Sequence, residues 1–395
     1  MRLESSSHYD ALTAPSRARK IIRHGDTIFA TIRPSLRRIA QVPRELDNEV
    51  ASTAFCVLRP NRAVIDPDYL FYSVCHDRFI GRVVAQQSGA NYPAVRDKDV
   101  LATTISFPEL SEQVQISQVL SRVRESALRQ FALLECAYAL KVAAMHQLFT
   151  RGLRGQPQKD TAFGPVPTSW DVEELGECAE VQTGAAKGQR MLDSEAIEVP
   201  YLRVANVQDG YIDLTEIRTI RIREADFKRY SLRSGDVLLT EGGDLDKLGR
   251  GFVWRGELEG CIHQNHVFAV RPIRDRIHSD FLAYLVQSAY GKAYFLKVAH
   301  KTTNLACINT AKLRAFPMLI PPLAEQHGII DILGRIDQKI DLHKRKKATL
   351  DQLFNVLLNQ LMTGKIRVSD LDLTALEIAP PETEPSHSPT AAATE

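Results

Sequence analysis

The chain contains few cysteines and no long hydrophobic run. Six cysteines occur among its 395 residues, scattered and without a C-x-x-C pair, a pattern typical of reduced thiols rather than disulfides. No run of about 18 apolar residues is present, and the N-terminus lacks the apolar segment that signal peptides carry. These absences predict a cytoplasmic protein that does not cross a membrane.

Sequence motifs for nucleotide hydrolysis and methyl transfer are also missing. The phosphate-binding loop G-x-x-x-x-G-K-[ST] does not occur, and residues 184–190, which resemble it, have neither Ser nor Thr after Lys187. Residues 66–69 (DPDY) differ by one residue from the [DN]-P-P-[YF] pocket of amino-methyltransferases, but no glycine-rich cofactor loop accompanies them. They are equally consistent with the cap and first turn of a helix. We therefore expect no catalytic site on this chain.

Charge is unevenly distributed along the sequence. The formal net charge is +2, but residues 369–395 hold six acidic side chains and no Lys or Arg. This stretch is rich in Pro, Thr and Ser and has too few apolar residues to form a core, so residues 367–395 are expected to be a disordered acidic tail. The remaining basic body is compatible with a polyanionic partner but does not require one. Its size and its 44% hydrophobic content suit two domains.

What the chain does have is an internal repeat. The segment FPELSEQVQISQVLSRV, which begins at Phe107, resembles IPPLAEQHGIIDILGRI, which begins at Ile320. Glu112 of the first copy falls on Glu325 of the second, a separation of 213 residues, the difference between 325 and 112. Further matches upstream are Gly25-Asp26 with Gly235-Asp236 and Arg59-Pro60 with Arg271-Pro272. The repeat predicts two copies of one unit, each a globular part followed by a long helix.

Both copies of the repeated segment have the apolar spacing of a coiled-coil helix, with intervals of three and four residues. The apolar positions are Ile116, Leu120, Val123, Ala127, Leu134, Ala137, Ala144 and Leu148 in the first copy, and Ile329, Leu333, Ile336, Ile340, Leu350, Phe354, Leu357 and Leu361 in the second. Prolines precede and glycines follow each segment, so we predict helices over residues 110–153 and 321–366. They are expected to form an antiparallel coiled coil that holds two globular parts apart; the alternative is a helical hairpin that serves only as core.

The globular parts are expected to mix strands and helices. Between residues 168 and 320, short alternating runs bounded by Gly and Asp predict strands, interrupted by one amphipathic helix that is capped by Ser279 and Asp280 and extends to Tyr294. The counterpart, residues 1–109, lacks the opening strands, for which an upstream start, a truncated gene and a reduced domain are alternatives. With a linker at residues 154–167, the predicted fold class is α+β: two mixed α/β domains, the first incomplete at its N-terminus, joined by two long helices.

One polar segment of the second globular part has the residue types of a metal site. Cys261, His263 and His266 are possible ligands, and residues 241–246 resemble a cation-binding loop. In a strand, residues 261 and 263 face one side and residue 266 the other, so one ion cannot take all three without a bulge. No metal site is therefore predicted. A better interpretation, with a satisfied polar turn as the alternative, is a set of donors and acceptors for DNA bases: His263, Gln264, Asn265 and His266.

Basic and polar loops bounded by turn residues are further candidates for DNA contact. Arg, Lys, Thr and Asn side chains bind phosphates and so fix the position of a protein on the duplex. The candidates are Arg33, Arg37, Arg38, Asn91, Lys187, Arg190, Lys247, Arg250, Lys301, Thr302, Thr303 and Asn304. A solvated surface position is the alternative for each of them, so the prediction applies to the loops as groups.

Taken together, these features resemble the DNA specificity subunits of type I restriction-modification systems. The resemblance covers nearly the whole chain, and the combination of its motifs is more specific than any one of them. The motifs are the P-x-L-[SA]-E-Q openings at Pro108 and Pro321, the helix ends QLFTRG at Gln147 and QLMTGK at Gln360, and the Gly-Asp-x-[IL]-[FL] strands at Gly25 and Gly235.

The resemblance implies a non-catalytic subunit with two target recognition domains, each reading one half of a split sequence in double-stranded DNA. Its long helices would set the gap between the half-sites and bind two methyltransferase subunits, and a restriction subunit would join the complex. The candidate contact residues on these helices are Glu112, Gln113, Glu325 and Gln326. The partner subunits would hold S-adenosylmethionine, ATP and Mg, so no cofactor is expected on this chain.

Two other functions fit the same sequence. A degenerate subunit would bind the methyltransferase through its helices but read one half-site or none, as the missing start of the first domain allows. A free-standing DNA-modifying enzyme is the third possibility, and it would require methylation by the purified chain alone.

Overall fold

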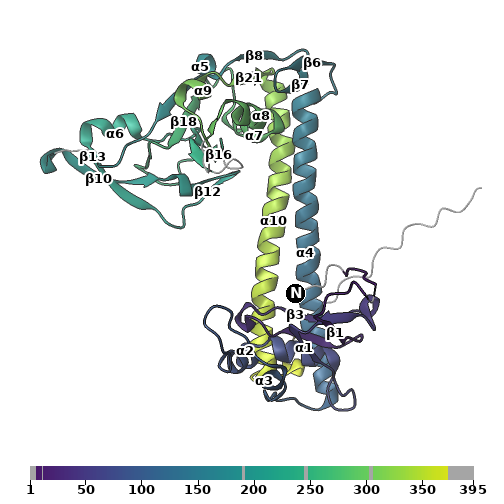
Figure 1. Cartoon of the computed structure of the whole chain (residues 1–395). Helices are drawn as coiled ribbons and strands as arrows, with labels where there is room; N and C mark the ends of the chain where they lie inside the picture. Colours follow the sequence, from purple (N-terminus) through teal and green to yellow (C-terminus); the bar gives the residue numbers. More distant parts are fainter. Residues whose placement is uncertain (1–5, 11, 189–191, 244–247, 302–305, 372–395) are drawn as a thin grey trace, which may run out of the picture. The chain divides into compact units, whose positions relative to one another are not determined.

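The computed structural model describes residues 6–10, 12–188, 192–243, 248–301 and 306–371. The chain divides into two compact units, unit 1 (Met1–Ala132 with His343–Glu395) and unit 2 (Leu133–Leu342). Two long helices, α4 (Leu110–Arg151) and α10 (Leu323–Met362), each contribute one half to unit 1 and the other half to unit 2 (Figure 1). No helix over the described residues is long and apolar enough to cross a membrane.

The globular part of unit 1 contains two small antiparallel sheets. One pairs β1 (Ala18–Ile21) with β4 (Val50–Ser52), and the other has the order β3 (Ile39–Gln41), β2 (Thr27–Ala30), β5 (Phe55–Leu58). The helices are α1 (Pro67–Cys75), α2 (Asp77–Val84) and α3 (Asp97–Leu101), with short 3-10 turns at Pro34–Leu36, Arg44–Leu46 and Val368–Asp370. The Asp66 side chain accepts a hydrogen bond of 2.9 Å from the N–H of Tyr69 and caps α1, so residues 66–69 are a helix start.

Unit 2 contains more sheets than unit 1 and a larger one. Its four-stranded antiparallel sheet has the order β16 (Gly251–Val253), β14 (Val237–Thr240), β18 (Val267–Pro272), β9 (Ala179–Thr183). Two three-stranded sheets have the orders β13 (Arg218–Arg223), β10 (Ala196–Leu202), β17 (Ile262–His263) and β15 (Gly242–Gly243), β20 (Ala306–Cys307), β19 (His300–Lys301). The remaining pairs are β6 (Gln158–Thr161) with β7 (Gly164–Pro167), β8 (Asp171–Glu174) with β21 (Pro317–Ile320), and β11 (Val207–Gln208) with β12 (Tyr211–Ile212).

Helices of unit 2 cover these sheets and join them to the long helices. They are α5 (Leu175–Cys178), α6 (Glu224–Tyr230), α7 (Ser279–Gln287), α8 (Ala289–Val298) and α9 (Thr310–Arg314), with 3-10 turns at Asp193–Glu195 and Val204–Asn206. In the core, Trp170 and Phe281 are fully buried with their ring centroids 6.1 Å apart. They belong to the same apolar cluster as Ile329 and Leu333 of α10. Burial of side chains of this size stabilises the fold by about 2 kcal/mol each.

One buried ion pair occurs in both units at equivalent places. Asp26 and Asp236 are each 1% exposed. Arg59 reaches Asp26 at 2.6 Å, and Arg271 reaches Asp236 at 2.8 Å. The glycine before each aspartate has a φ of 87° or 99°, a conformation that glycine adopts without strain. A buried carboxylate requires such a partner, so the shared turn and pair confirm the repeat at its upstream end.

Within each unit, α4 and α10 run side by side in opposite directions (Figure 1). In unit 1, Ile116 near the start of α4 lies in the same cluster as Leu361 near the end of α10. In unit 2, Leu134 and Ala137 of α4 pack with Ile340 of α10. The predicted seam is therefore confirmed, and the helices lie within the predicted ranges 110–153 and 321–366. The polar interruption at His343 is satisfied, because its Nδ1 lies 2.8 Å from Gln130 Oε1.

The amphipathic helix predicted in unit 2 is two helices instead of one. The chain breaks at Ser288 between α7 and α8, and the Ser288 side chain accepts a hydrogen bond from the N–H three residues on. The cap of α7 is also different from the prediction: His278, not Ser279 or Asp280, supplies the acceptor, 3.2 Å from the N–H of Asp280. Unit 1 repeats the break, with His76 between α1 and α2. Periodicity alone misses this break because the apolar positions keep their helical spacing across Ser288, from Leu285 and Val286 to Ala289 and Tyr290.

Candidate nucleic-acid interface

Two candidate loops of unit 2 lie directly against each other. The N–H of Ala185 donates to the carbonyl of His263 at 2.8 Å, and the N–H of Asn265 donates back to the carbonyl of Ala185 at 3.0 Å. Ala185, two residues after the end of β9, forms an isolated parallel bridge with Gln264, which directly follows β17. The loop that carries Lys187 is therefore held beside Gln264 and Asn265.

The segment of residues 240–243 connects the other candidate loops of unit 2 to the loop that carries Gln264 and Asn265. The N–H of Glu241 donates to the carbonyl of His266 at 3.0 Å, and the N–H of Thr240 donates to the carbonyl of Arg250 at 2.9 Å. Strand β15 then pairs with β20, which pairs with β19, so the backbone of Lys301 joins the group. Main-chain pairing thus gathers four loops that are far apart in the sequence.

Unit 1 has the same arrangement in a smaller form. Ile32 forms an antiparallel bridge with Ala94, at the place where unit 2 pairs Gly242 with Cys307. The N–H of Arg33 donates to the carbonyl of Pro93 at 2.7 Å, and its guanidinium lies 5.2 Å from the centre of the Tyr92 ring. The exposed Asn91 directly precedes Tyr92 in the same loop. The bridge and the hydrogen bond therefore hold the loops of Arg33 and Asn91 next to each other.

The arginines of unit 1 are held in an unusual backbone conformation. Arg33 and Arg37 have φ values of 51° and 52° and flank the short turn Pro34–Leu36. A left-handed conformation at a residue other than Gly costs about 1 kcal/mol or more and often marks a functional site. Arg33, Arg37 and Arg38 are all exposed, and Arg37 forms an ion pair of 2.6 Å with Asp77.

In unit 2 the candidate side chains differ in exposure. Lys187 is exposed, with its Nζ 5.6 Å from the Tyr201 ring centre, whereas Gln264 and Asn265 are half-buried. His266 is exposed, and its ring bonds to Glu241. Arg250 is half-buried, and its Nε has no hydrogen-bond partner among the described residues. Five candidates lie outside the described residues, as does the side chain of Lys301: Arg190, Lys247, Thr302, Thr303 and Asn304.

His263 does not fit the predicted role in base recognition. Its side chain is 0% exposed, and its Nδ1–H donates to the carbonyl of Val267 at 2.7 Å. Burial lowers the pKa of His263 to about 4, so the ring is neutral, and its Nε2 has no partner among the described residues. The ring therefore belongs to the core. The sequence did not reveal this, because strand alternation shows which residues share a face but not which of the two faces is buried.

The two glutamines predicted to contact a partner are also buried. Gln326 is 0% exposed; its Nε2 donates to the carbonyls of Arg276 (2.8 Å) and Pro321 (2.9 Å), and its Oε1 accepts from the N–H of His278 at 2.8 Å. Gln113 repeats this in unit 1: its side chain is 0% exposed and bonds to backbone at Val64, Pro108 and Asp66. Both side chains therefore join a globular part to its helix and are not available to another subunit.

The two glutamates of the same motif differ from each other. Glu325 is half-buried and accepts hydrogen bonds from the N–H of Leu153 (3.0 Å), Gln156 Nε2 (2.8 Å) and Trp170 Nε1 (3.2 Å). Glu112 forms no hydrogen bond or ion pair with any residue that the structure describes. Only Glu112 of these four residues remains available for a contact with another molecule.

Sequence reasoning missed the exposed arginines of β13. Arg218, Arg221 and Arg223 are exposed, while Ile222 between them is buried. Arg218 pairs with Glu216 at 2.7 Å, and Arg221 pairs with Asp193. The strand belongs to the sheet that carries β17 and the loop after it. The alternation of Ile and Arg over residues 220–223 was the available signal, because it has the period of a half-buried strand.

The buried cysteines and the described His, Asp and Glu side chains provide neither an activated thiol nor a cluster of metal ligands. No group of three or more His, Cys, Asp or Glu side chains there could hold a metal ion. The cysteines are free, and burial raises the pKa of Cys56 and Cys178 to about 11 and that of Cys261 to about 12. These thiols stay protonated at neutral pH and are poor nucleophiles.

The family model and the similar proteins point to the same family. A family model described as the type I restriction modification DNA specificity domain matches residues 15–133 and 167–352, more than half of the chain. The type I restriction enzyme MjaVIII specificity subunit of Methanocaldococcus jannaschii is 28% identical over 336 residues, 82% of this chain and 76% of that protein. The StySPI specificity subunit of Salmonella potsdam is 25% identical, over 75% of this chain and 63% of its own length. Another M. jannaschii relative, 29% identical, is matched over 48% of its length, so the chain spans about half of that protein.

Solved structures agree in fold. A chain from a structure described as showing complex assembly and conformational transition of the type I R-M system is 27% identical, with a TM-score of 0.51 and coverage of 89% of this chain and 85% of that one. The type I restriction-modification S subunit of M. genitalium is 16% identical, with a TM-score of 0.52 and coverage of 87% and 84%, and shows the fold alone. The predicted α+β fold is confirmed. The chain belongs to the family of proteins that contain the type I restriction modification DNA specificity domain.

Proposed function

We propose that this chain is the sequence-specific DNA-binding subunit of a type I restriction-modification complex and reads a bipartite target in double-stranded DNA. The observation that carries the proposal is the convergence of the candidate loops in each unit. In unit 2, main-chain pairing brings the Lys187, Arg250, His266 and Lys301 loops to one place. In unit 1, the Arg33 and Asn91 loops meet at the equivalent bridge.

The side chains at this place have the chemistry that DNA recognition uses. Exposed Lys187 and the arginines of unit 1 suit phosphates, which position a protein without reading sequence. The amides of Gln264 and Asn265 can each donate to and accept from one adenine edge in the major groove. Two such units in one chain would read two half-sites.

The chain itself is proposed to be non-catalytic. Methyltransferase and restriction subunits would supply the chemistry and would hold S-adenosylmethionine, ATP and Mg. Relatives named as specificity subunits, and the complex assembly described for a similar solved chain, support this division of labour. A chromosomal target would place the complex in the cytoplasm.

Co-expression with the methyltransferase subunit of the same genome, followed by single-molecule mapping of modified bases, tests the proposal. A two-part motif with a constant gap is the expected result. Methylation by the purified chain alone would contradict it, because the chain would then be an enzyme.

A pair of matched variants tests the interface. Lys187→Ala is expected to weaken DNA binding by the complex and to lower the slope of log affinity against log salt by about 1. Lys228→Ala, which removes an exposed lysine of α6 outside the candidate loops, should change neither. Equal effects of the two variants would mean that the loops are not the DNA-binding surface.

One observation favours a second candidate function. Over its described residues, unit 1 has one sheet of two strands and one of three, far less than unit 2. A subunit that binds the methyltransferase but reads only one half-site, or none, would fit this smaller part. The same mapping separates the two candidates: a palindrome of one half-site, or no modification, favours the second.

A further inference from the structure

The second half of α10 has an exposed face made mainly of basic and polar side chains. This half, residues 343–362, belongs to unit 1. The exposed side of the helix that lies away from its seam is called the outer face here, and it includes Lys346, Thr349, Gln352, Asn355, Val356 and Asn359. Residues 343–362 hold four Lys or Arg and one acidic residue, Asp351. Asp351 is half-buried and pairs with Lys347 of the seam at 2.6 Å, so the outer face keeps its positive charge.

The internal repeat shows that this composition is particular to α10. The separation of 213 residues places six positions of α4 in unit 2 on those of the outer face, all of them exposed: Leu133, Cys136, Ala139, Val142, Ala143 and His146. Four of the six are aliphatic, whereas the outer face has one aliphatic residue, Val356. A coiled coil depends on its seam and not on these positions for its stability, so the difference indicates different ligands.

The outer face does not correspond to a place that strands cover in unit 2. The described opening strands of unit 2 leave the equivalent positions of α4 exposed, and the Val142 side chain there is 69% exposed. The outer face of α10 is therefore a surface in its own right, and its ligand has to be inferred from its own chemistry and from its neighbours in unit 1.

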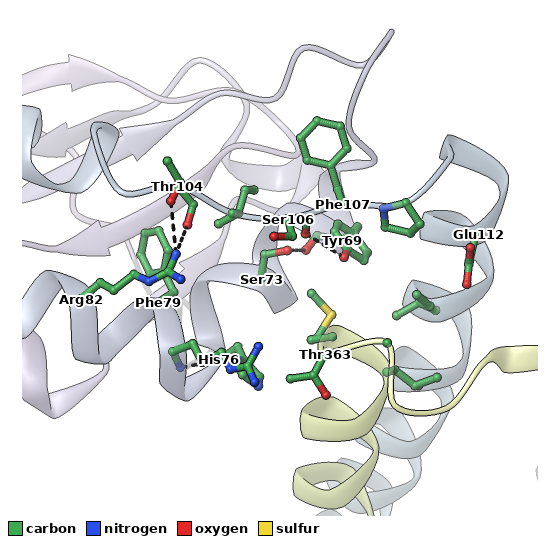
Figure 2. Close-up of a pocket in the computed structure, with 17 residues that line it drawn as sticks. Tyr69, Ser73, His76, Phe79, Arg82, Thr104, Ser106, Phe107, Glu112 and Thr363 are labelled. Atoms are coloured by element: carbon green, nitrogen blue, oxygen red, sulfur yellow. Dashed lines mark hydrogen bonds between the residues drawn. The ribbon is translucent and has the colours of Figure 1, made fainter.

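A groove connects the outer face with a candidate DNA-binding loop of unit 1. The groove has a volume of about 520 Å³ and is lined by Arg37 and, from α10, by Asn355, Val356 and Asn359. Among its described lining residues, only His76 also lines the cavity beside the start of α4 (Figure 2). The loop that carries the exposed Arg37 in a left-handed conformation therefore lies at one end of the outer face.

The side chains of the outer face have the chemistry of phosphate contacts. Lys, Thr, Gln and Asn bind phosphate and sugar oxygens, and such contacts position a protein on DNA without reading its sequence. From Lys346 to Asn359 the helix rises about 20 Å, the length of about six base-pair steps of roughly 3.4 Å. Lys346 is exposed and forms no ion pair with any residue that the structure describes, so its charge is available to a phosphate.

We propose that the outer face of α10 binds the sugar-phosphate backbone of double-stranded DNA next to the half-site that unit 1 reads. This inference rests on the proposed function and adds a contact to it that is independent of base sequence. Lys346 neutralises one phosphate, Thr349, Gln352 and the two asparagines donate hydrogen bonds to others, and Arg37 connects these contacts to the recognition loop. The equivalent face of α4 has no such role, because most of its side chains are aliphatic.

The test uses the complex of the full chain with the methyltransferase subunit and a labelled duplex that contains the mapped motif. Fluorescence anisotropy at several salt concentrations gives the affinity and the slope of log affinity against log salt. Lys346→Gln should weaken binding about three- to tenfold at low salt and lower the slope by about 1. The methylated motif should keep both half-sites, since a backbone contact carries no base information. An unchanged slope or an altered motif would overturn the proposal.

A matched pair of added charges keeps the test independent of folding, because both positions are exposed. Gln352→Lys adds a cation to the outer face, so it should tighten DNA binding by a similar factor and steepen the slope by about 1. Ala139→Lys adds the same charge at the equivalent position of α4 and should change neither quantity. Equal effects of the two variants would reflect net charge alone and would overturn the proposal.

Two further outcomes separate this inference from a protein ligand and from the proposed function. If Lys346→Gln and Val356→Ala impair assembly with the methyltransferase subunit in size-exclusion chromatography and leave the salt slope unchanged, the ligand is a protein and the proposal is wrong. If the unchanged complex binds a duplex without the motif equally well, the proposed function fails, and this inference with it. If the complex prefers the motif and Lys187→Ala lowers the slope while Lys346→Gln does not, only the inference about α10 is overturned.

Discussion

At the scale of single residues, one buried glutamine in each unit joins the globular part to its own helix. Gln326→Ala would remove three hydrogen bonds and leave the carbonyl of Arg276 and the N–H of His278 without those partners. We expect the free energy of unfolding of unit 2 to fall by about 2–4 kcal/mol, since buried polar groups that lose their partners are costly. Urea denaturation followed by tryptophan fluorescence measures it, because both tryptophans belong to unit 2. Gln338→Ala, an exposed position of α10, is the control; equal losses would contradict the role of Gln326.

The burial of the single residue His263 predicts that the fold loses stability at acid pH. Burial lowers its pKa to about 4 in the folded state, below the ordinary value of about 6.5, so the unfolded chain binds more protons between these values. Stability that is present above pH 6.5 is therefore lost as the pH falls toward 4, by up to about 3 kcal/mol. In His263→Asn this part of the pH dependence should disappear. Urea titrations at pH 7.5 and pH 5 measure it, and an unchanged difference between the two pH values would contradict the prediction.

At the scale of elements, the helix seam holds each unit together. Leu333 of α10 is 0% exposed in the core of unit 2, whereas Leu342 of the same helix is 44% exposed. Leu333→Ala leaves a cavity and should lower the free energy of unfolding by about 2–5 kcal/mol. Leu342→Ala should lower it by less than about 1 kcal/mol. The same urea experiment compares them, and a similar loss in both variants would show that the seam is not the principal contact of the helix.

At the scale of the whole molecule, the two helices are predicted to set the gap between the DNA half-sites. Four residues inserted into both helices add about 6 Å to each, close to two base-pair steps of roughly 3.4 Å. The mapped methylation motif should then keep both half-sites and gain a longer unread gap. Insertion into one helix alone shifts its seam against its partner and should reduce stability instead. An unchanged gap after the double insertion would contradict the ruler prediction.

Much of the fold could be predicted from the sequence because its signals are local and periodic. The heptad spacing in 110–153 and 321–366 places the helices, and the repeat around Glu112 and Glu325 predicts two similar units. The break at Ser288 was missed, since a polar side chain that caps a new helix leaves the apolar period intact. The buried roles of Gln113 and Gln326 were also missed, because a glutamine on a helix gives no local sign of the loop carbonyls that it will meet.

By itself, the sequence determined the family, the α+β class and the loops from which DNA contacts could come, because these depend on residue types and spacing along the chain. Only the tertiary structure decided which candidate residues are placed where they could contact DNA. It placed the Lys187, Arg250 and His266 loops together through main-chain pairing, and it buried His263 in the core. It also separated Glu112 from Glu325, since the second is covered by a strand and an indole and the first is not. Such differences arise from contacts between distant segments, which no local pattern records.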